Sequence, residues 1–182
     1  PAMPGIYKVS LSKYEDGKIS ELIPPQAFKV NSLNAASLPA TDKKALDEFC
    51  KKVSEIRRAV VAADSYRGEL VNKIKFIRQA IIETPAVMPD AAMQINNIEK
   101  RLVDVNTKLN GDGSLARREF ETPPSVSSRI GAIEGSLWTA SAAPTQTFIQ
   151  SYETAGSQFA PLLDELKKLD TDIRKLEDLL EQ

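Results

Sequence analysis

The dominant pattern in this sequence is an apolar residue at every third or fourth position over most of its length. Such spacing places the apolar side chains on one stripe of an α-helix, and a stripe needs a surface to pack against. The first stripe comprises Leu46, Phe49, Val53, Ile56, Val60, Ala63, Leu70, Ile74, Ile77 and Ile81, with Arg67 as the one polar interruption. The second comprises Ile95, Ile98, Leu102, Val105 and Leu109. The third comprises Phe148, Tyr152, Ala155, Phe159, Leu162, Leu166, Leu169, Ile173, Leu176 and Leu180. The pattern specifies helix packing and, by itself, no chemistry.

Capping residues and prolines divide the first half of this pattern into helices. Thr41 or Asp42 is placed to cap a long helix that continues to about Glu83. A second helix begins at Pro89–Ala92 and ends at Asn110–Gly111, where glycine favours helix termination. The first of these helices is far longer than the average helix of a globular protein.

The second half reads in the same way. Residues 111–124 are expected to form a surface loop, and Pro123–Ser125 begins a third helix. A last helix should run from about Thr145 to the end of the chain. Pro144 should end, kink or begin a helix here, and Pro161 should kink or break the last one.

These elements predict a mainly α fold, an antiparallel bundle of about four helices over residues 34–182, two long and two shorter. The simplest packing sets the first and last helices antiparallel, with the middle pair completing the bundle. Phe148, Tyr152 and Phe159 would form the aromatic part of the core, and Gly68 is a candidate bend or point of close approach.

Residues 1–33 are predicted to form a β-hairpin. The segment 5–12 alternates, and the Asp-Gly pair within Glu15–Lys18 supplies the positive φ that a tight turn needs. A second short strand, Gln26–Val30, follows Pro24–Pro25. Two strands alone are marginal in water, so they should pack on the helices or belong to a larger sheet.

Composition limits the possible partners. The chain has 182 residues, 42% of them hydrophobic, and a net charge of −1, so no electrostatic footprint for nucleic acid or an anionic membrane is expected. No apolar run approaches the ~18 residues that cross a bilayer. The opening Pro1–Pro4 and the helical pattern still running at Gln182 suggest a piece of a longer protein.

The absence of histidine excludes several classes of site. Ser-His-Asp, Cys-His and His-Glu-x-x-His arrangements all require it. Cys50 is the single cysteine, so the chain can form neither an internal disulfide nor a cysteine-based zinc cluster. We expect Cys50 to be a partly buried structural thiol.

The loop Asn110–Ser114 has part of the pattern of a calcium-binding site. Counting from Asn110, oxygen-bearing side chains fall at the first, third and fifth positions, and Glu121 falls at the twelfth, as in an EF-hand. The sixth position, which needs glycine, is Leu115, and Arg117 and Arg118 would repel a cation. A plain glycine-rich loop is the favoured interpretation.

Other candidates are weaker. Ser10 and Lys13 match Ser-x-x-Lys but lie in an alternating strand, whereas the acyl-transfer motif opens a helix. Glu134 is the carboxylate with the fewest charged neighbours, and a solvent-exposed side chain is the favoured interpretation. Trp138 is expected in the core or at the rim of an interface. We therefore assign no catalytic, cofactor-binding or metal-binding residue and expect no cofactor.

The hairpin segments Pro4–Leu11 and Pro25–Val30 look like the last hairpin of an Ig-like β-sandwich. With a long helical tail after it, the layout resembles the C-terminal region of large bacterial β-propeller proteins that carry BNR or sortilin (Vps10)-like repeats and are labelled glycosyl hydrolases. The resemblance implies that any catalytic or sugar-binding site lies in a propeller outside this chain, and that the parent is periplasmic or secreted. It transfers no functional residue to this sequence.

The resulting expectation is a non-catalytic accessory or interaction domain at the C-terminus of a larger, exported, carbohydrate-active protein. Its partners would be the preceding domains of the same polypeptide or a second copy. One alternative is a self-assembling coiled coil whose long helices form a dimer seam. Another is a glycosidase that uses a carboxylate pair in a concave pocket.

Overall fold

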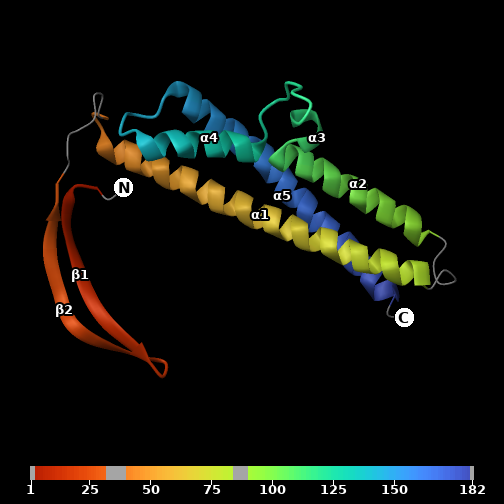
Figure 1. Cartoon of the computed structure of the whole chain (residues 1–182), viewed down its shortest axis with the longest axis horizontal. Coiled ribbons are helices and arrows are strands. Elements are labelled where there is room, and N and C mark those ends of the chain that lie inside the picture. Colours follow the sequence, from red (N-terminus) through yellow and green to blue (C-terminus); the bar gives the residue numbers. More distant parts are fainter. Residues whose placement is uncertain (1–2, 32–39, 84–89, 181–182) are drawn as a thin grey trace. The chain divides into compact units, whose positions relative to one another are not determined.

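A computed structural model describes residues 3–31, 40–83 and 90–180 of the chain. These residues divide into two compact units: the first comprises Pro1–Glu48 with Ser141–Ala143, and the second Phe49–Ala140 with Pro144–Gln182. The described elements are β1 (Gly5–Glu15), β2 (Lys18–Val30), α1 (Lys43–Glu83), α2 (Ala91–Asn110), α3 (Gly113–Ala116), α4 (Val126–Thr139) and α5 (Gln146–Leu180) (Figure 1). The expected mainly helical bundle with an N-terminal hairpin is confirmed.

Strands β1 and β2 form the predicted antiparallel hairpin. Asp16 and Gly17 join them with φ angles of 50° and 76°, the two positive values that a type I′ turn requires. The strands are longer than expected, because Pro24–Pro25 lies inside β2 instead of preceding it. The register shifts between Val9 and Leu11, and such an irregularity accommodates residues that cannot donate to the ladder.

The long helix α1 begins and continues as predicted. Of the two proposed caps, Asp42 fills the role: its Oδ1 accepts hydrogen bonds from the backbone N–H groups of Lys44 and Ala45, each at 2.9 Å. Gly68 marks no close approach, because a Cβ built there would meet nothing within 4 Å. The predicted start of the second helix at Pro89 lies outside the described residues.

Helices α2 and α4 end and begin where the sequence predicts. Gly111 follows α2 with a φ of 90°, and its N–H donates to the carbonyl of Thr107 at 2.8 Å. Ser125 caps α4, accepting from the N–H of Ser128 at 3.2 Å. The expectation of a plain loop between them was incomplete, because Asp112 caps the single turn α3 within it.

Helix α5 settles the role of the two prolines. Pro144 lies between α4 and α5, while Pro161 lies inside α5, which is continuous. Thr145 caps the helix, its Oγ1 accepting from the N–H of Phe148 at 3.3 Å. Pro161 has no N–H to donate to the carbonyl of Ser157, four residues earlier. Both residues are exposed, so water can replace the missing hydrogen bond.

The two long helices run parallel, which corrects the antiparallel packing expected from the sequence (Figure 1). Three contacts advance in step along both: Phe49 meets Tyr152 with ring centroids 5.9 Å apart, Ile56 lies beside Gly156, and Lys73 pairs with Glu177 at 3.5 Å. The arrangement is possible because the intervening chain returns through two helices in succession.

Helices α2 and α4 provide that return, one after the other along α1. Arg78 of α1 pairs with Glu99 of α2 at 2.6 Å, and Arg57 pairs with Glu134 of α4. Arg57, which comes earlier on α1, thus pairs with Glu134, which comes later in the chain than Glu99. Both short helices run antiparallel to α1, and the bundle is antiparallel in this sense.

A single apolar core joins α1, α2, α4 and α5. Its buried members are Val53, Val60, Ala63, Leu70, Ile74, Ile77, Ile95, Ile98, Leu102, Val105, Leu109, Val126, Ile130, Ile133, Ala155, Phe159, Leu162, Leu166, Leu169, Ile173 and Leu176. Of the expected aromatic group, Phe159 is buried, and Phe148 and Tyr152 pack partly buried against the core. The apolar stripes identified in the sequence thus pack against one another within one chain.

Candidate functional site

The largest concentration of charge between helices is centred on Arg101. Its guanidinium spans two turns of α5, donating to Glu165 at 2.6 Å and to Asp172 at 2.7 Å. The hydrogen bond from Arg101 holds the pKa of Asp172 below its ordinary value. The pKa of Arg101 is raised, chiefly by the hydrogen bond to Asp172. This clasp fixes α2 against α5.

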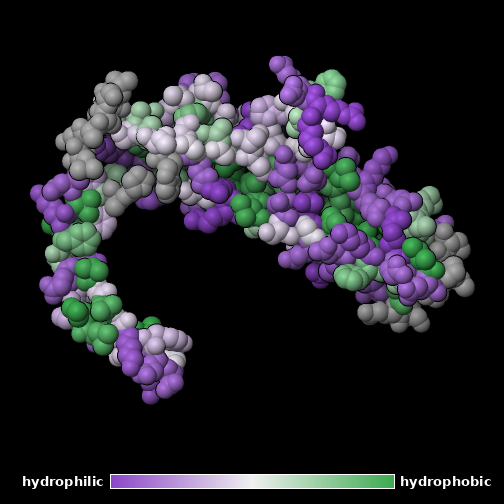
Figure 2. Space-filling model, viewed as in Figure 1, coloured by the Kyte–Doolittle hydropathy of each residue, from purple (hydrophilic) through white to green (hydrophobic). Residues whose placement is uncertain are grey.

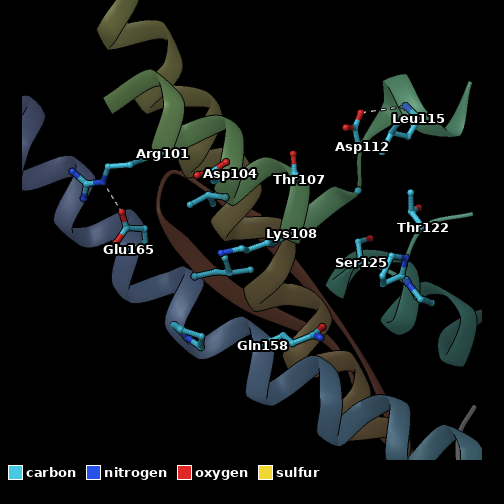
Figure 3. A pocket seen from close by; sticks show the side chains of 16 residues that line it. Arg101, Asp104, Thr107, Lys108, Asp112, Leu115, Thr122, Ser125, Gln158 and Glu165 are labelled. Carbon is cyan, nitrogen blue, oxygen red and sulfur yellow. Dashed lines mark hydrogen bonds and ion pairs between the residues drawn. The ribbon is translucent and has the colours of Figure 1, made fainter. Parts of the chain in front are cut away.

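Next to the clasp lies a cleft of about 740 Å³ between α2, α5 and the segment around α3 (Figure 3). Helix α2 contributes Arg101 and Lys108, α5 contributes Gln158 and Glu165, and Asp112 lies on the α3 side. The volume is in the range of small-molecule sites. Its charges are mixed in sign, so the cleft favours no single ligand charge.

Asp112, one of the carboxylates of this cleft, does not have the properties of a general acid. Asp112 accepts from the side chain and N–H of Ser114 and from the N–H of Leu115, and these hydrogen bonds lower its pKa, the Ser114 hydroxyl contributing most. Glu165 is held by Arg101. A general acid in a carboxylate pair needs a raised pKa. The hydrogen bonds at Asp112 act in the opposite direction.

Hydrogen bonds within the protein organise the segment Asn110–Ser114, which has part of the calcium-loop pattern. Asn110 ends α2, and its Nδ2 donates to Asp64 at 2.7 Å while its Oδ1 accepts from Ser127 at 2.9 Å. The Oδ1 of Asp112 caps α3. Among the described residues, no group of three or more Asp, Glu, Cys or His side chains is placed to hold a metal ion.

The remaining candidates are placed as follows. Glu134, expected to be the least paired carboxylate, pairs with Arg57, a partner 77 positions away that local sequence could not reveal. Cys50 is partly buried, as expected. Ser10 and Lys13 both lie in β1, not at the start of a helix. The side chain of Trp138 lies outside the described part of the structure.

The hairpin carries an exposed apolar surface. We define the apolar face of the hairpin as the side chains that alternation and pairing place together: Tyr7, Val9, Leu11, Ile23 and Phe28. Val9 and Leu11 are 57% and 55% exposed. Figure 2 shows apolar side chains, in green, at the surface of the hairpin. Tyr7 and Phe28 stack across the strands with centroids 6.0 Å apart. Sequence alternation had indicated the β1 part of this face.

The opposite face of the hairpin differs in composition. Lys8, Ser10 and Ser12 alternate along it between Ile6 and Tyr14. The apolar residues of this face lie apart from one another, Ile6 near the open end of the hairpin and Tyr14 and Ile19 near the turn, each at least 73% exposed. The apolar face, by contrast, is continuous from Tyr7 through Val9 to Leu11 along β1, which is the arrangement of a sheet face that a second layer covers.

Comparison with known proteins adds no family to this description. The chain matches no family model, and no similar protein was found among curated proteins or solved structures. In the described ranges, none of the helices combines the length and apolar character needed to cross a membrane. The geometry above is thus the basis for any functional proposal.

Proposed function

We propose that this chain is a non-catalytic interaction module whose hairpin packs against a β-sheet of a larger protein. The observation that carries the proposal is the exposed apolar face of the hairpin. An isolated pair of strands is marginal in water, and a sheet layer over that face would stabilise it. The partner is a sheet because β1 and β2 already present the alternating surface that a second layer covers.

In its finer form, the proposal makes the partner a β-sandwich domain preceding this chain in the same polypeptide. The parent would be an exported carbohydrate-active protein of the propeller class named above. This part rests on the resemblance of Pro4–Leu11 and Pro25–Val30 to a terminal sandwich hairpin. In that setting the helical bundle is an accessory domain.

A self-assembling coiled coil is the alternative from a different class. It needs an apolar seam on the long helices that faces a second copy. Val60, Leu70 and Ile74 of α1 are each no more than 4% exposed within one chain. Burial of that seam in the intramolecular core favours the interaction module.

The first experiment measures molar mass by light scattering after size exclusion, for residues 1–182 and for a version starting at Asn34. We expect a compact monomer for the shorter version, because the apolar core joins α1, α2, α4 and α5, all of which it keeps. A dimer for both versions would instead support the coiled coil. Aggregation only after removal of the hairpin would contradict the proposal, since the hairpin would then be covering the core.

A second experiment tests the apolar face itself. In the full chain, Val9→Thr with Phe28→Thr should lower the fluorescence of bound ANS, a dye that reports exposed apolar surface. The matched control, Ser10→Thr with Ser12→Thr, changes polar positions of the opposite face and should leave the fluorescence nearly unchanged. Equal effects would remove the basis for one-sided docking.

The glycosidase alternative has its own test. Hydrolysis of a panel of chromogenic glycosides by the purified chain would support it and contradict a non-catalytic role. We expect no turnover above the uncatalysed rate.

A further inference from the structure

A second cleft, of about 550 Å³, lies between α4, the start of α5 and the segment around α3. Arg129 of α4 lines it, and the Nε of this guanidinium is buried without a hydrogen-bond partner among the described residues. Buried polar groups are nearly always satisfied in native proteins. Arg129 as a whole is only partly buried and lines the cleft, so its guanidinium, which is always charged, can meet a partner from outside the chain.

The surroundings of Arg129 select an anion. Ser128, Thr147 and Ser151 bring hydroxyl groups to the same cleft. The cleft also includes the first turn of α4, whose partial positive charge favours a negative group. Guanidinium groups bind carboxylate and phosphate oxygens through paired, charge-assisted hydrogen bonds.

The charge of the cleft limits which anion fits. Asp112 also lines it, and its pKa is lowered by the hydrogen bonds from Ser114 and Leu115, so it stays ionised at neutral pH. A single guanidinium can neutralise only one of the two charges of a dianionic phosphate, and the second charge would be repelled by Asp112, whereas a monoanionic carboxylate is neutralised fully. Phe148 and Ile133 add apolar surface for the body of a ligand.

We propose that this cleft binds the carboxylate of a small organic acid, with the Arg129 guanidinium as its anchor. The proposal is independent of the docking role of the hairpin, which belongs to the other compact unit. The hydroxyl groups would complete the hydrogen bonds of the carboxylate, and the apolar lining would contact the rest of the molecule. Benzoate should accordingly bind more tightly than acetate.

The test is an NMR titration of arginine Nε–H resonances in the full chain at constant ionic strength. The Arg129 resonance, identified by its absence in Arg129→Gln, should shift and saturate with acetate and benzoate. It should not saturate with chloride. No saturable shift, or tighter binding of inorganic phosphate than of acetate, would overturn the proposal.

Variants distinguish the contribution of the Arg129 guanidinium from that of positive charge elsewhere on the protein. Arg129→Gln should weaken benzoate binding about tenfold or more, as loss of a charged hydrogen bond predicts. Arg129→Lys keeps the charge but loses the planar fork, so it should also bind more weakly. Arg118→Gln, at an exposed arginine, is the matched control and should bind as the unaltered protein does.

The alternative to an external ligand is an ion pair between Arg129 and Asp112, and this alternative can be tested directly. If Arg129 paired with Asp112 in solution, Asp112→Asn would shift the Arg129 resonance before any ligand is added, and the proposal would fail. Asparagine caps a helix about as well as aspartate, so α3 should persist in this variant. We expect an unchanged resonance without ligand and binding at least as tight.

Discussion

At the scale of single residues, Arg101 shows how one side chain can organise two helices. Its fork reaches Glu165 and Asp172, which lie two turns apart on α5. Both carboxylates and the guanidinium are partly exposed, at 31%, 36% and 27%. Screening by water therefore limits the contribution of each pair to under about 1 kcal/mol.

The Asp172 pair predicts a dependence of stability on pH. A carboxyl whose pKa is lower in the folded state stabilises the fold above its unfolded pKa and loses that effect as pH falls through the folded value. Asp172→Asn should therefore be less stable than the unaltered protein at neutral pH. The difference in free energy of unfolding between the two proteins, called the gap below, should narrow below about pH 4.

Urea unfolding followed by circular dichroism at several pH values measures this gap. Asp164→Asn is a suitable control because Asp164 is 69% exposed and its ion-pair partner among the described residues is a lysine on its own helix, at 3.5 Å. A gap for Asp172→Asn that widens toward acid would contradict the lowered pKa.

Core residues predict larger effects. Leu166 is fully buried, and Leu→Ala substitutions at such positions lower the free energy of unfolding by about 2–5 kcal/mol. Val103, 62% exposed on α2, should change stability by under about 0.5 kcal/mol when replaced by alanine. Urea unfolding of both variants makes the comparison, and similar losses would mean that the assigned core is wrong.

At the scale of elements, α5 accommodates a proline that local rules treat as a breaker. Pro161 lies in a 35-residue helix, between the buried residues Phe159 and Leu162. The packed side chains on either side hold the helix together through the missing hydrogen bond. Tertiary packing thus overrides a local penalty of ~3 kcal/mol relative to alanine.

Pro161→Ala should therefore stabilise the chain, by about 1 kcal/mol or more, because alanine restores the backbone donor. The matched control is Ala160→Ser, a mild change at the neighbouring exposed position. Thermal and urea unfolding provide the measurement. A loss of stability would show that a bend at this proline is needed for α5 to pack.

At the scale of the whole bundle, two parallel long helices are connected by a return path made of α2 and α4. Together these two cover 34 residues, from 20 and 14, which nearly equals the 35 residues of α5. The return path can therefore accompany α5 over its length. The segment around α3 makes this possible because the chain does not reverse between α2 and α4.

Parallel packing can be tested by chemical cross-linking of the unaltered chain, with one substitution as the control. The Nζ of Lys73 lies 3.5 Å from Glu177, so a carbodiimide, which joins an amine directly to a carboxylate, should link these two residues. Mass spectrometry of the digested monomer should identify that product, and Glu177→Gln should abolish it. In an antiparallel pair, Lys73 would instead meet the first turns of α5, and a link to Glu153 would contradict the structure.

The sequence by itself determined the elements and most of their ends. Apolar spacing defined the stripes, and Asp42, Gly111, Ser125 and the Asp16–Gly17 turn act through neighbours within a few positions. These signals are local, since a cap or a turn is satisfied by its own backbone. The same locality explains why Pro24–Pro25 and the turn α3 were misjudged, because strand pairing and a short capped turn depend on context.

Only the tertiary structure decided how the helices run and which polar groups meet. An apolar stripe fits a parallel or an antiparallel neighbour equally well, so periodicity carries no direction. Arg57 with Glu134 and Arg101 with Asp172 are separated by 77 and 71 positions, and Arg129 became notable only through the burial of its Nε. Those facts arise from packing across the bundle, and no local pattern in the chain encodes them.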